Sequence, residues 1–448
     1  MMTKSELLKK RVGFISLGCD KNRVDLEKII FSIKNAGFKI VTNPIDAHII
    51  IINTCSFIES SRQESIGTIL EMANYKSLNL EKLIITGCIN EMGYSDLESS
   101  LPEVDAFIRL ADNDNIVEKI YQLYEVNLDN DNHKITGLNR ILTTPKHYAY
   151  LKIGDGCNNF CSYCKIPYIR GRFKSEKIED LVKEANQLVD SGVTELILVA
   201  QDVTKYGIDL YGKIMLCELI NELSKIDKLK WIRLLYCYPE NITDELIETI
   251  ANNKKVCKYL DIPMQHVNSR VLKQMNRKSN FESLEILINK LKSKIKDISI
   301  RTTFILGFPG ETDEEFKQLC DFVERHKLNN VGFFTYSKEE GTLAYKMENQ
   351  IPKNIKNKRL KTISELQFKV VNKLNQSFVG KEVEVVVDEI DGEYTVCRSM
   401  YQTPLVDSLI FIKNNKLIVG NFYKIKITNH LNYDFEGELL WTPQINYH

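Results

Sequence analysis

The chain has 448 residues, more than one ordinary hydrophobic core accommodates, so we expect two to four domains. Hydrophobic residues make up 43% and charged residues 27% of the chain, a composition that excludes intrinsic disorder. Sixty basic residues balance sixty acidic ones, so whole-chain electrostatics give no argument for nucleic-acid binding.

The chain carries no targeting or membrane signal that we can identify. Residues 1–6 are not followed by the apolar stretch of a secretory signal, and no run of about eighteen apolar residues occurs. We therefore expect a cytoplasmic protein without a membrane partner. In a reducing compartment, its eleven cysteines indicate metal binding or catalysis more than disulfides.

Three apolar segments near the start share one design. Residues 12–19, 48–55 and 82–88 each read as a buried strand that ends in a cysteine and precedes a plausible helix. Such an alternation predicts a parallel sheet covered on both faces, with ligands at the carboxyl ends of its strands. We expect Cys19, Cys55 and Cys88 to converge there as metal ligands. The alternative is that they are buried thiols that behave as small hydrophobic residues.

A second strand–helix series follows a polar linker at residues 127–147. Six apolar segments are predicted as strands, at residues 149–153, 195–200, 231–235, 259–262, 299–306 and 331–335. This number of units predicts a barrel or partial barrel with its function at the carboxyl-end loops.

In the last part of the chain, the spacing of hydrophobic residues changes from a helical to a strand period. Residues 354–376 read as a connecting helix, after which Val383, Val385 and Val387 follow the two-residue period of a strand. We expect a small antiparallel barrel here. The predicted fold is therefore α/β, with these parts: an α/β domain at 1–126, a linker at 127–147, a partial barrel at 148–353, a helix at 354–376 and a β-barrel at 377–448.

Three cysteines occur within the eight residues Cys157-Asn158-Asn159-Phe160-Cys161-Ser162-Tyr163-Cys164. Thiolates select zinc or iron–sulfur clusters. A 4Fe–4S cluster usually takes four thiolates, so three would leave one iron open. The amino and carboxylate groups of S-adenosylmethionine can chelate an open iron. A structural zinc site is the alternative, but it normally has four ligands.

The spacing Cys157-x3-Cys161-x2-Cys164, with Tyr163 before the last cysteine, resembles the signature of the radical S-adenosylmethionine (SAM) superfamily. This resemblance implies that Tyr163 lies at the cofactor. It also implies that Gln201 and Asp202 lie at the methionine amino group. The segment 305–312 is similar to the glycine motif of that superfamily, which implies that three of its residues lie beside the adenosine: Gly307, Gly310 and Glu311.

The order of the predicted domains narrows the resemblance to the methylthiotransferases. Ser16-Leu17-Gly18-Cys19-x-Lys21-Asn22, Ile166-Pro167-x-Ile169-Arg170-Gly171 and Ala200-Gln201-Asp202-Val203-Thr204-x-Tyr206-Gly207 are similar to motifs of the RimO-type branch. The resemblance implies a TRAM-like terminal barrel and two 4Fe–4S clusters, one on Cys157, Cys161 and Cys164 and the other on Cys19, Cys55 and Cys88.

The resemblance also implies a reaction. Reductive cleavage of SAM, with electrons from an external donor, gives a 5′-deoxyadenosyl radical. This radical takes hydrogen from the β-carbon of an aspartate in small-subunit ribosomal protein twelve. The second cluster delivers sulfur, and another SAM supplies the methyl group.

The charge of the terminal segment distinguishes two substrate classes. Residues 377–448 contain six basic and ten acidic residues. An acidic module repels phosphate and attracts a basic protein, whereas tRNA binding requires a basic face. A ribosomal protein is thus favoured over a tRNA adenosine as the substrate. A second alternative is a non-catalytic iron–sulfur or zinc protein that uses the barrel as a binding module.

Two further residues each allow two interpretations. His266 lies at a predicted strand end, where it either faces substrate or forms ordinary hydrogen bonds. Arg301 either binds a carboxylate or pairs with an acidic neighbour. Cysteines with no shared spacing are predicted to be core thiols, namely Cys217, Cys237, Cys257, Cys320 and Cys397.

Overall fold

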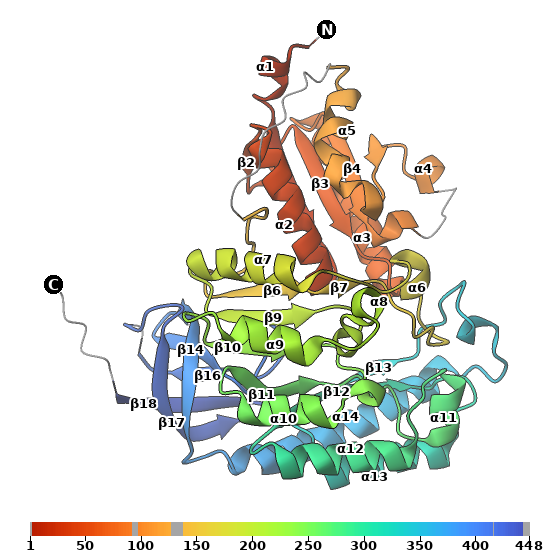
Figure 1. Cartoon of the computed structure of the whole chain (residues 1–448). Helices are drawn as coiled ribbons and strands as arrows, with labels where there is room; N and C mark the ends of the chain where they lie inside the picture. Colours follow the sequence, from red (N-terminus) through yellow and green to blue (C-terminus); the bar gives the residue numbers. More distant parts are fainter. Residues whose placement is uncertain (1, 92–96, 127–137, 415, 442–448) are drawn as a thin grey trace. The chain divides into compact units, whose positions relative to one another are not determined.

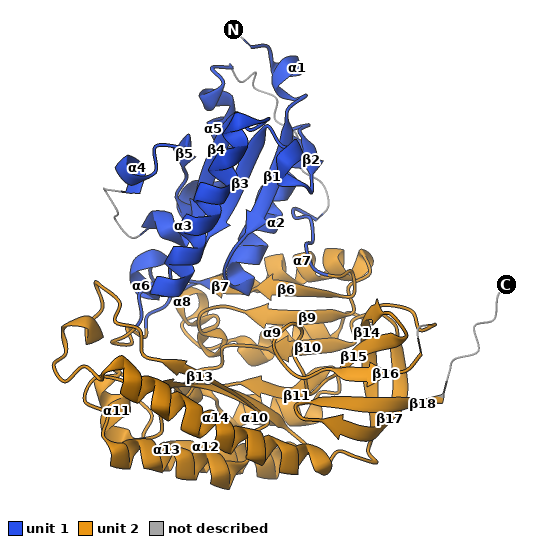
Figure 2. Ribbon diagram, turned by 180° about the vertical axis from the view of Figure 1, so that it is seen from behind, with its two compact units in different colours: residues 1–144, 155–158, 164–174 blue, residues 145–154, 159–163, 175–448 orange. Residues whose placement is uncertain are grey.

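The computed structural model describes residues 2–91, 97–126, 138–414 and 416–441. It divides into two compact units (Figure 2): unit 1 comprises residues 1–144, 155–158 and 164–174, and unit 2 comprises residues 145–154, 159–163 and 175–448. Part of the predicted linker, residues 127–137, and the end of the predicted barrel, residues 442–448, lie outside the described residues.

Unit 1 is built on a five-stranded parallel sheet of order β2-β1-β3-β4-β5. The three predicted strands are present, and two short edge strands extend them. The bounds are β1 (Arg11–Ser16), β2 (Lys39–Val41), β3 (Ile49–Thr54), β4 (Lys82–Gly87) and β5 (Ala106–Phe107).

Helices cover both faces of this sheet (Figure 1), which explains why β3 is buried along its whole length. Ile49 and Ile51 pack with helices α2 and α5, whereas Ile50 and Ile52 point to the other face and pack with α3. The helices of unit 1 are α1 (Lys4–Leu7), α2 (Asp20–Asn35), α3 (Glu59–Ala73), α4 (Leu97–Ser100), α5 (Ile116–Leu123) and α6 (Ile166–Ile169).

Unit 2 contains the predicted six-stranded series as an open parallel sheet of order β13-β12-β11-β10-β9-β6. Its strands are β6 (Tyr148–Lys152), β9 (Glu195–Val199), β10 (Trp231–Leu234), β11 (Val256–Asp261), β12 (Ser299–Leu306) and β13 (Asn330–Thr335). Two short strands, β7 (Gly154–Asp155) and β8 (Lys174–Ser175), lie where the chain passes from one unit to the other.

Helices alternate with these strands along the chain. They are α7 (Ile178–Asp190), α8 (Ile208–Tyr211), α9 (Leu216–Ser224), α10 (Asp244–Asn252), α11 (Ser269–Gln274), α12 (Phe281–Lys294), α13 (Asp313–His326) and α14 (Lys353–Gln376). The last corresponds to the predicted connecting helix. None of the helices in the described ranges is long and apolar enough to cross a membrane.

The terminal segment forms a closed five-stranded barrel of order β14-β15-β16-β18-β17. Its strands are β14 (Glu382–Asp391), β15 (Tyr394–Ser399), β16 (Ile410–Ile412), β17 (Phe422–Leu431) and β18 (Asp434–Trp441). One pairing departs from the expected antiparallel pattern, because β16 runs parallel to β18 where the barrel closes. Val385 and Val387 point into the barrel core, as the two-residue period predicts.

The barrel packs against the open sheet of unit 2 through buried charges. Arg398 of β15 pairs with Glu195, the first residue of β9, and Arg233 donates to the same Glu195 carboxylate at 2.8 Å. On the outer face of the barrel, Val386 lies opposite Arg398 and is only 1% exposed. The barrel thus sits at the amino ends of the strands. A strand of this length places Gln201 about 20 Å from Glu195.

Candidate functional site

The cysteine loop begins with a turn that only glycine can make. Gly156 has a φ of +75°, and a Cβ atom there would lie 2.2 Å from the carbonyl oxygen of Arg172. The Cys157 N–H donates to the carbonyl of Gly171 at 3.0 Å. In the same unit, the Ile166 N–H at the start of α6 donates to Cys164 Sγ at 3.4 Å. A donor aimed at sulfur favours the thiolate, the form that binds iron.

Cys161 lies in the part of the loop that belongs to unit 2. Its Sγ is 2.7 Å from the Tyr238 hydroxyl oxygen, and the Arg277 guanidinium lies 3.6 Å from the centre of the Tyr238 ring. The preceding residue, Phe160, has a φ of +47°, and its carbonyl accepts from Asn276 Nδ2 at 2.8 Å. The fold therefore places hydrogen-bonding groups at two of the three loop sulfurs.

Asp202 follows β9 and is fully buried. Its carboxylate accepts from Asn159 Nδ2 at 2.9 Å and from the Thr204 N–H at 3.1 Å. Burial raises the pKa of Asp202, while the hydrogen bonds from Thr204 and Asn159 lower it. Because Asn159 stands between Cys157 and Cys161 in the sequence, Asp202 holds the cysteine loop to the end of β9. Its neighbour Gln201 is partly exposed.

The predicted glycine motif lies at the end of β12, which is the same end of the parallel sheet. Gly307 and Gly310 have φ values of +68° and +77°. The Gly307 N–H donates to Glu311 Oε2 at 2.9 Å. Tyr163 packs in one cluster with Phe308, so the aromatic residue of the cysteine loop contacts the glycine motif. The Gln201–Asp202 motif and the glycine motif therefore lie at one edge of the unit 2 sheet.

In unit 1, Cys19 and Cys88 both lie beside one asparagine, and Cys55 lies close enough to interact electrostatically with both. Cys19 Sγ lies 3.9 Å and Cys88 Sγ 3.7 Å from Asn22 Oδ1. A Cβ atom on Gly18 would come within 3.2 Å of Cys55 Sγ. Each cysteine follows the carboxyl end of its strand. The parallel register of β1, β3 and β4 aligns these ends along one edge of the sheet. The predicted convergence of the three cysteines is therefore present.

Asn22 is itself held by an arginine that our sequence reasoning did not select. Arg170 Nη2 donates to Asn22 Oδ1 at 2.5 Å and to Asp25 Oδ2 at 2.9 Å, and Nη1 donates to Asp155 Oδ2 at 2.7 Å. Asn22 and Arg170 both lie in motifs that resemble the RimO-type branch, and this resemblance is the sequence signal that could have identified them. Within unit 1, Arg170 connects the segment after Cys164 to the helix after Cys19.

The Cys55 and Cys88 thiols are protonated unless a metal displaces the proton. Burial raises the pKa of Cys55 and raises that of Cys88 to about 12. Within the described residues, no three His, Cys, Asp or Glu side chains stand in a ready-made metal-binding geometry. The soft donor set and its common focus nevertheless fit an iron–sulfur cluster, because a metal ion deprotonates a coordinating thiol.

The residues with open interpretations have ordinary partners. His266 is fully buried, its Nδ1 accepts from the Asn268 N–H at 2.9 Å, and its Nε2 lies 3.6 Å from Glu311 Oε2. Arg301 pairs with Asp407 at 2.9 Å, so the acidic-neighbour alternative is correct. The five remaining cysteines are buried, or partly buried in the case of Cys320.

Three family models match the chain in the predicted order. Residues 11–109 match the Uncharacterized protein family UPF0004, residues 151–323 match the Radical SAM superfamily, and residues 379–440 match the TRAM domain. The Radical SAM match implies a 4Fe–4S cluster and SAM as cofactors.

Among solved structures, the fold is similar to that of the radical S-adenosylmethionine methyltransferase TsrM from Kitasatospora setae, solved with cobalamin and a [4Fe-4S] cluster bound. The TM-score is 0.55 at 12% identity, over 73% of this chain and 75% of that one. This likeness concerns the fold alone.

Two curated relatives match almost end to end, and both are named ribosomal protein uS12 methylthiotransferase RimO. The protein from Clostridium tetani (strain Massachusetts / E88) is 46% identical over 96% of this chain and 98% of its own length. That from Thermoanaerobacter sp. (strain X514) is 47% identical over 96% of this chain and 100% of its own. The chain belongs to the RimO family of ribosomal protein uS12 methylthiotransferases.

Proposed function

We propose that this protein inserts a methylthio group at the β-carbon of an aspartate in ribosomal protein uS12 by radical SAM chemistry. One observation carries the proposal: a three-cysteine loop with donors to its sulfurs occurs in the same chain as a second, separate set of three converging thiols. The near full-length similarity to proteins named uS12 methylthiotransferases supports the choice of substrate.

Cys157, Cys161 and Cys164 would hold the first 4Fe–4S cluster. When bound, such a cluster supplies an open iron for the amino and carboxylate groups of SAM and the electron that cleaves it. The chain's own residues orient these partners. Asp202 holds the cysteine loop through Asn159, and the positive φ angles of Gly307 and Gly310 let the backbone approach the adenosine closely.

Cys19, Cys55 and Cys88 would hold a second 4Fe–4S cluster as the source of sulfur. Asn22 and Arg170 support this assignment, because together they fix the backbone and side chains around the three thiols. Asn22 Nδ2 donates to the carbonyls of Leu17 at 3.2 Å and Thr54 at 2.9 Å, next to Cys55 in the sequence. Ligand orientation by such neighbouring groups is typical of metal centres.

The charges of the terminal barrel support the proposal of a basic protein partner, although they do not form a uniform acidic face. Glu382 and Glu384 lie opposite Lys426 and Lys424 across the β14–β17 ladder, so these charges offset one another. At the exposed β14–β15 hairpin, Glu389 and Asp391 lie opposite Val396 and Tyr394, so no basic residue offsets them across that ladder, whereas Glu393 pairs with Lys413 at 3.6 Å.

This hairpin carries Glu389, Asp391 and Glu393, together with Ile390 and Tyr394, which are 39% and 36% exposed. An acidic tip with apolar neighbours fits a basic protein segment better than a phosphate backbone. We therefore propose the ribosomal protein, and not tRNA, as the partner of this surface. An external electron donor and a cytoplasmic location complete the proposal.

Mass spectrometry of uS12 and of tRNA from a deletion strain tests the substrate. We expect the methylthio mass increment on the uS12 aspartate to disappear in the deletion strain and to return with the wild-type gene, but not with the Cys161→Ala variant. Loss of a tRNA modification with uS12 unchanged would move the enzyme to the tRNA alternative. Absence of 5′-deoxyadenosine from reconstituted enzyme with SAM and reductant would support the non-catalytic alternative.

A further inference from the structure

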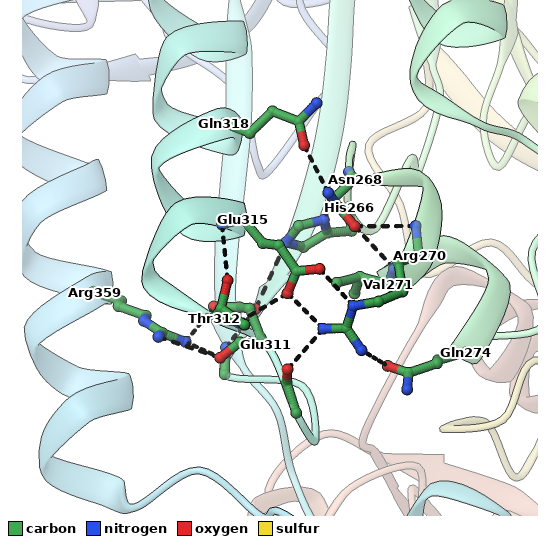
Figure 3. Close-up of polar contacts among 12 residues, drawn as sticks. His266, Asn268, Arg270, Val271, Gln274, Glu311, Thr312, Glu315, Gln318 and Arg359 are labelled. Atoms are coloured by element: carbon green, nitrogen blue, oxygen red, sulfur yellow. Dashed lines mark hydrogen bonds and ion pairs between the residues drawn. The ribbon is translucent and has the colours of Figure 1, made fainter.

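The glycine loop after β12 is closed by one buried carboxylate, that of Glu311. Its side chain is inaccessible to solvent, and both of its oxygens are occupied within the protein. Oε2 accepts from the Gly307 N–H at 2.9 Å, and Oε1 accepts from Arg359 Nη1 at 2.6 Å (Figure 3). Glu311 therefore shapes the loop through both of its carboxylate oxygens.

Arg359 makes further contacts to the same loop. Its Nη1 and Nη2 each lie 3.3 Å from the carbonyl oxygen of Glu311, and Nη2 donates to Asp313 at 2.8 Å. Arg359 as a whole is 5% exposed. Such a fork needs the planar geometry of arginine, because lysine offers a single point of charge.

Two other basic side chains near Glu311, those of His266 and Arg270, do not pair with its carboxylate as closely as Arg359 does. His266 faces Glu311 Oε2 from the other side, but at 3.6 Å, beyond hydrogen-bond length. Since His266 Nδ1 already accepts from Asn268, its Nε2 carries the hydrogen as a neutral ring. Arg270 is engaged by Glu315 at 2.5 Å and by the Gly310 carbonyl at 2.7 Å. Arg359 is thus the basic residue that hydrogen-bonds the Glu311 carboxylate directly.

The helix that carries Arg359 also covers the loop directly. A Cβ atom at Gly307 would lie 2.4 Å from Cγ of Lys356, one turn earlier on α14. Lys356 Nζ donates to the carbonyl of Tyr336, just after β13, at 2.8 Å. The first turns of α14 therefore pack on the glycine loop with no space between them.

From these contacts we infer that Arg359 is a positioning residue for SAM: by pairing with Glu311 it fixes the Gly307–Gly310 backbone in the shape that receives the cofactor. The inference rests on the proposed function, which assigns this loop to SAM. It gives α14, outside the matched radical SAM segment of residues 151–323, a part in cofactor binding.

The test compares SAM affinity in four variants of the anaerobically reconstituted full chain. Arg359→Gln should raise the dissociation constant by about ten- to a hundredfold, because a displaced positioning group misaligns the loop. Arg359→Lys should give an intermediate loss. Arg359→Gln combined with Glu311→Gln should recover most of the affinity, because the unpaired buried charge is removed. Lys361→Gln, at an exposed residue of the same helix, is the matched control and should bind as wild type.

Iron content, the melting midpoint and steady-state kinetics separate positioning from general stability. Positioning predicts a raised KM for SAM, with 5′-deoxyadenosine formation at saturating SAM within about twofold of wild type. Wild-type affinity in Arg359→Gln, or no recovery in the double variant, would overturn the inference. If Arg359→Gln fails to fold, unchanged affinity in a normally melting Arg359→Lys would do so. Failure of the wild type itself to bind SAM would instead refute the proposed function.

Discussion

The hydroxyl oxygen of Tyr238 lies 2.7 Å from Cys161 Sγ, and the Arg277 guanidinium stacks on the tyrosine ring. Burial raises the pKa of the Tyr238 phenol, so the hydroxyl keeps its proton and donates once the sulfur is a metal-bound thiolate. Hydrogen bonds to cluster sulfurs stabilise the reduced, more negative state, and they therefore raise the reduction potential.

Tyr238→Phe should lower the reduction potential of the radical SAM cluster, so the external donor reduces the cluster less readily, and 5′-deoxyadenosine should form about tenfold more slowly when that reduction limits the rate. The cluster should still assemble, because all three cysteines remain. Redox titration followed by electron paramagnetic resonance measures the potential, and an iron assay checks loading. Tyr394→Phe, at a partly exposed barrel tyrosine, is the control. An unchanged potential at full iron content would show that the contact has no electronic role.

Substitutions in the two sets of three cysteines should affect different steps of the reaction. Reconstituted wild type should bind about eight irons, and alanine at all three of Cys157, Cys161 and Cys164 should halve this number. Cys55→Ala should still release 5′-deoxyadenosine but form no methylthio product, since its set would hold the sulfur source.

Cys217→Ala provides the control for the cysteine variants, because Cys217 is buried and belongs to neither set. It should retain full iron and product. Normal product formation by Cys55→Ala would refute the sulfur-source assignment, and iron unchanged by the triple substitution would refute the first cluster.

The buried imidazole of His266 should make the apo-protein sensitive to acid. Burial lowers the pKa of His266 to about 3, so the unfolded chain binds a proton below pH 6.5 that the folded chain does not. This stabilising contribution is complete above pH 6.5 and is lost as the pH falls toward 3.

The difference in unfolding free energy between wild type and His266→Gln isolates this contribution. The advantage of wild type should shrink by about 2 kcal/mol between pH 6.5 and pH 5. The neighbouring Glu311, whose pKa is raised to about 7 by burial against the lowering effect of Arg359, contributes the opposite slope to both proteins. Denaturation at several pH values measures the difference, and a difference independent of pH would contradict the prediction.

Arg398→Met should loosen the barrel from the open sheet. Arg398 is fully buried and pairs with Glu195 and with Asp388 at 3.0 Å, so its loss leaves the buried Glu195 carboxylate and the partly exposed Asp388 carboxylate less compensated. We expect a destabilisation of about 3 kcal/mol by urea denaturation. Lys413→Met, which removes an exposed pair with Glu393, should cost less than about 1 kcal/mol. Equal effects would mean that the buried pairs do not hold the barrel.

Charge reversal at the β14–β15 hairpin should weaken binding to the basic ribosomal protein. Changing Glu389, Asp391 and Glu393 to lysine replaces attraction by repulsion, and wild-type affinity should itself fall with salt, because exposed charges are screened within about 10 Å at 0.1 M. Cleavage of SAM without substrate should survive. Affinities for uS12 and tRNA at two salt concentrations measure the effect.

A control with the same change in net charge reverses exposed acidic residues away from the barrel, at Glu245, Glu248 and Glu282. It should leave uS12 binding intact. Equal weakening by both sets would show that only net charge matters. Tight, salt-dependent binding of wild type to tRNA alone would contradict a protein substrate.

The sequence by itself determined the features that depend on local patterns. Three thiols within eight residues are close whatever the rest of the chain does. Apolar strands ending at Cys19, Cys55 and Cys88 had to bring their ends together, because parallel strands share one carboxyl edge. The edge strands β2 and β5 escaped prediction, since three and two residues carry too little period.

Only the tertiary structure decided which distant side chains meet. Arg359 and Glu311 are 48 residues apart, and the sequence showed α14 merely as a connecting helix. Val386 and Arg398 face outward from the barrel, where the alternating pattern predicts solvent, yet the open sheet buries both. Periodicity records which face of an element is apolar. It does not record which other element covers that face or neutralises a charge there, because that choice depends on how separate parts of the chain pack together.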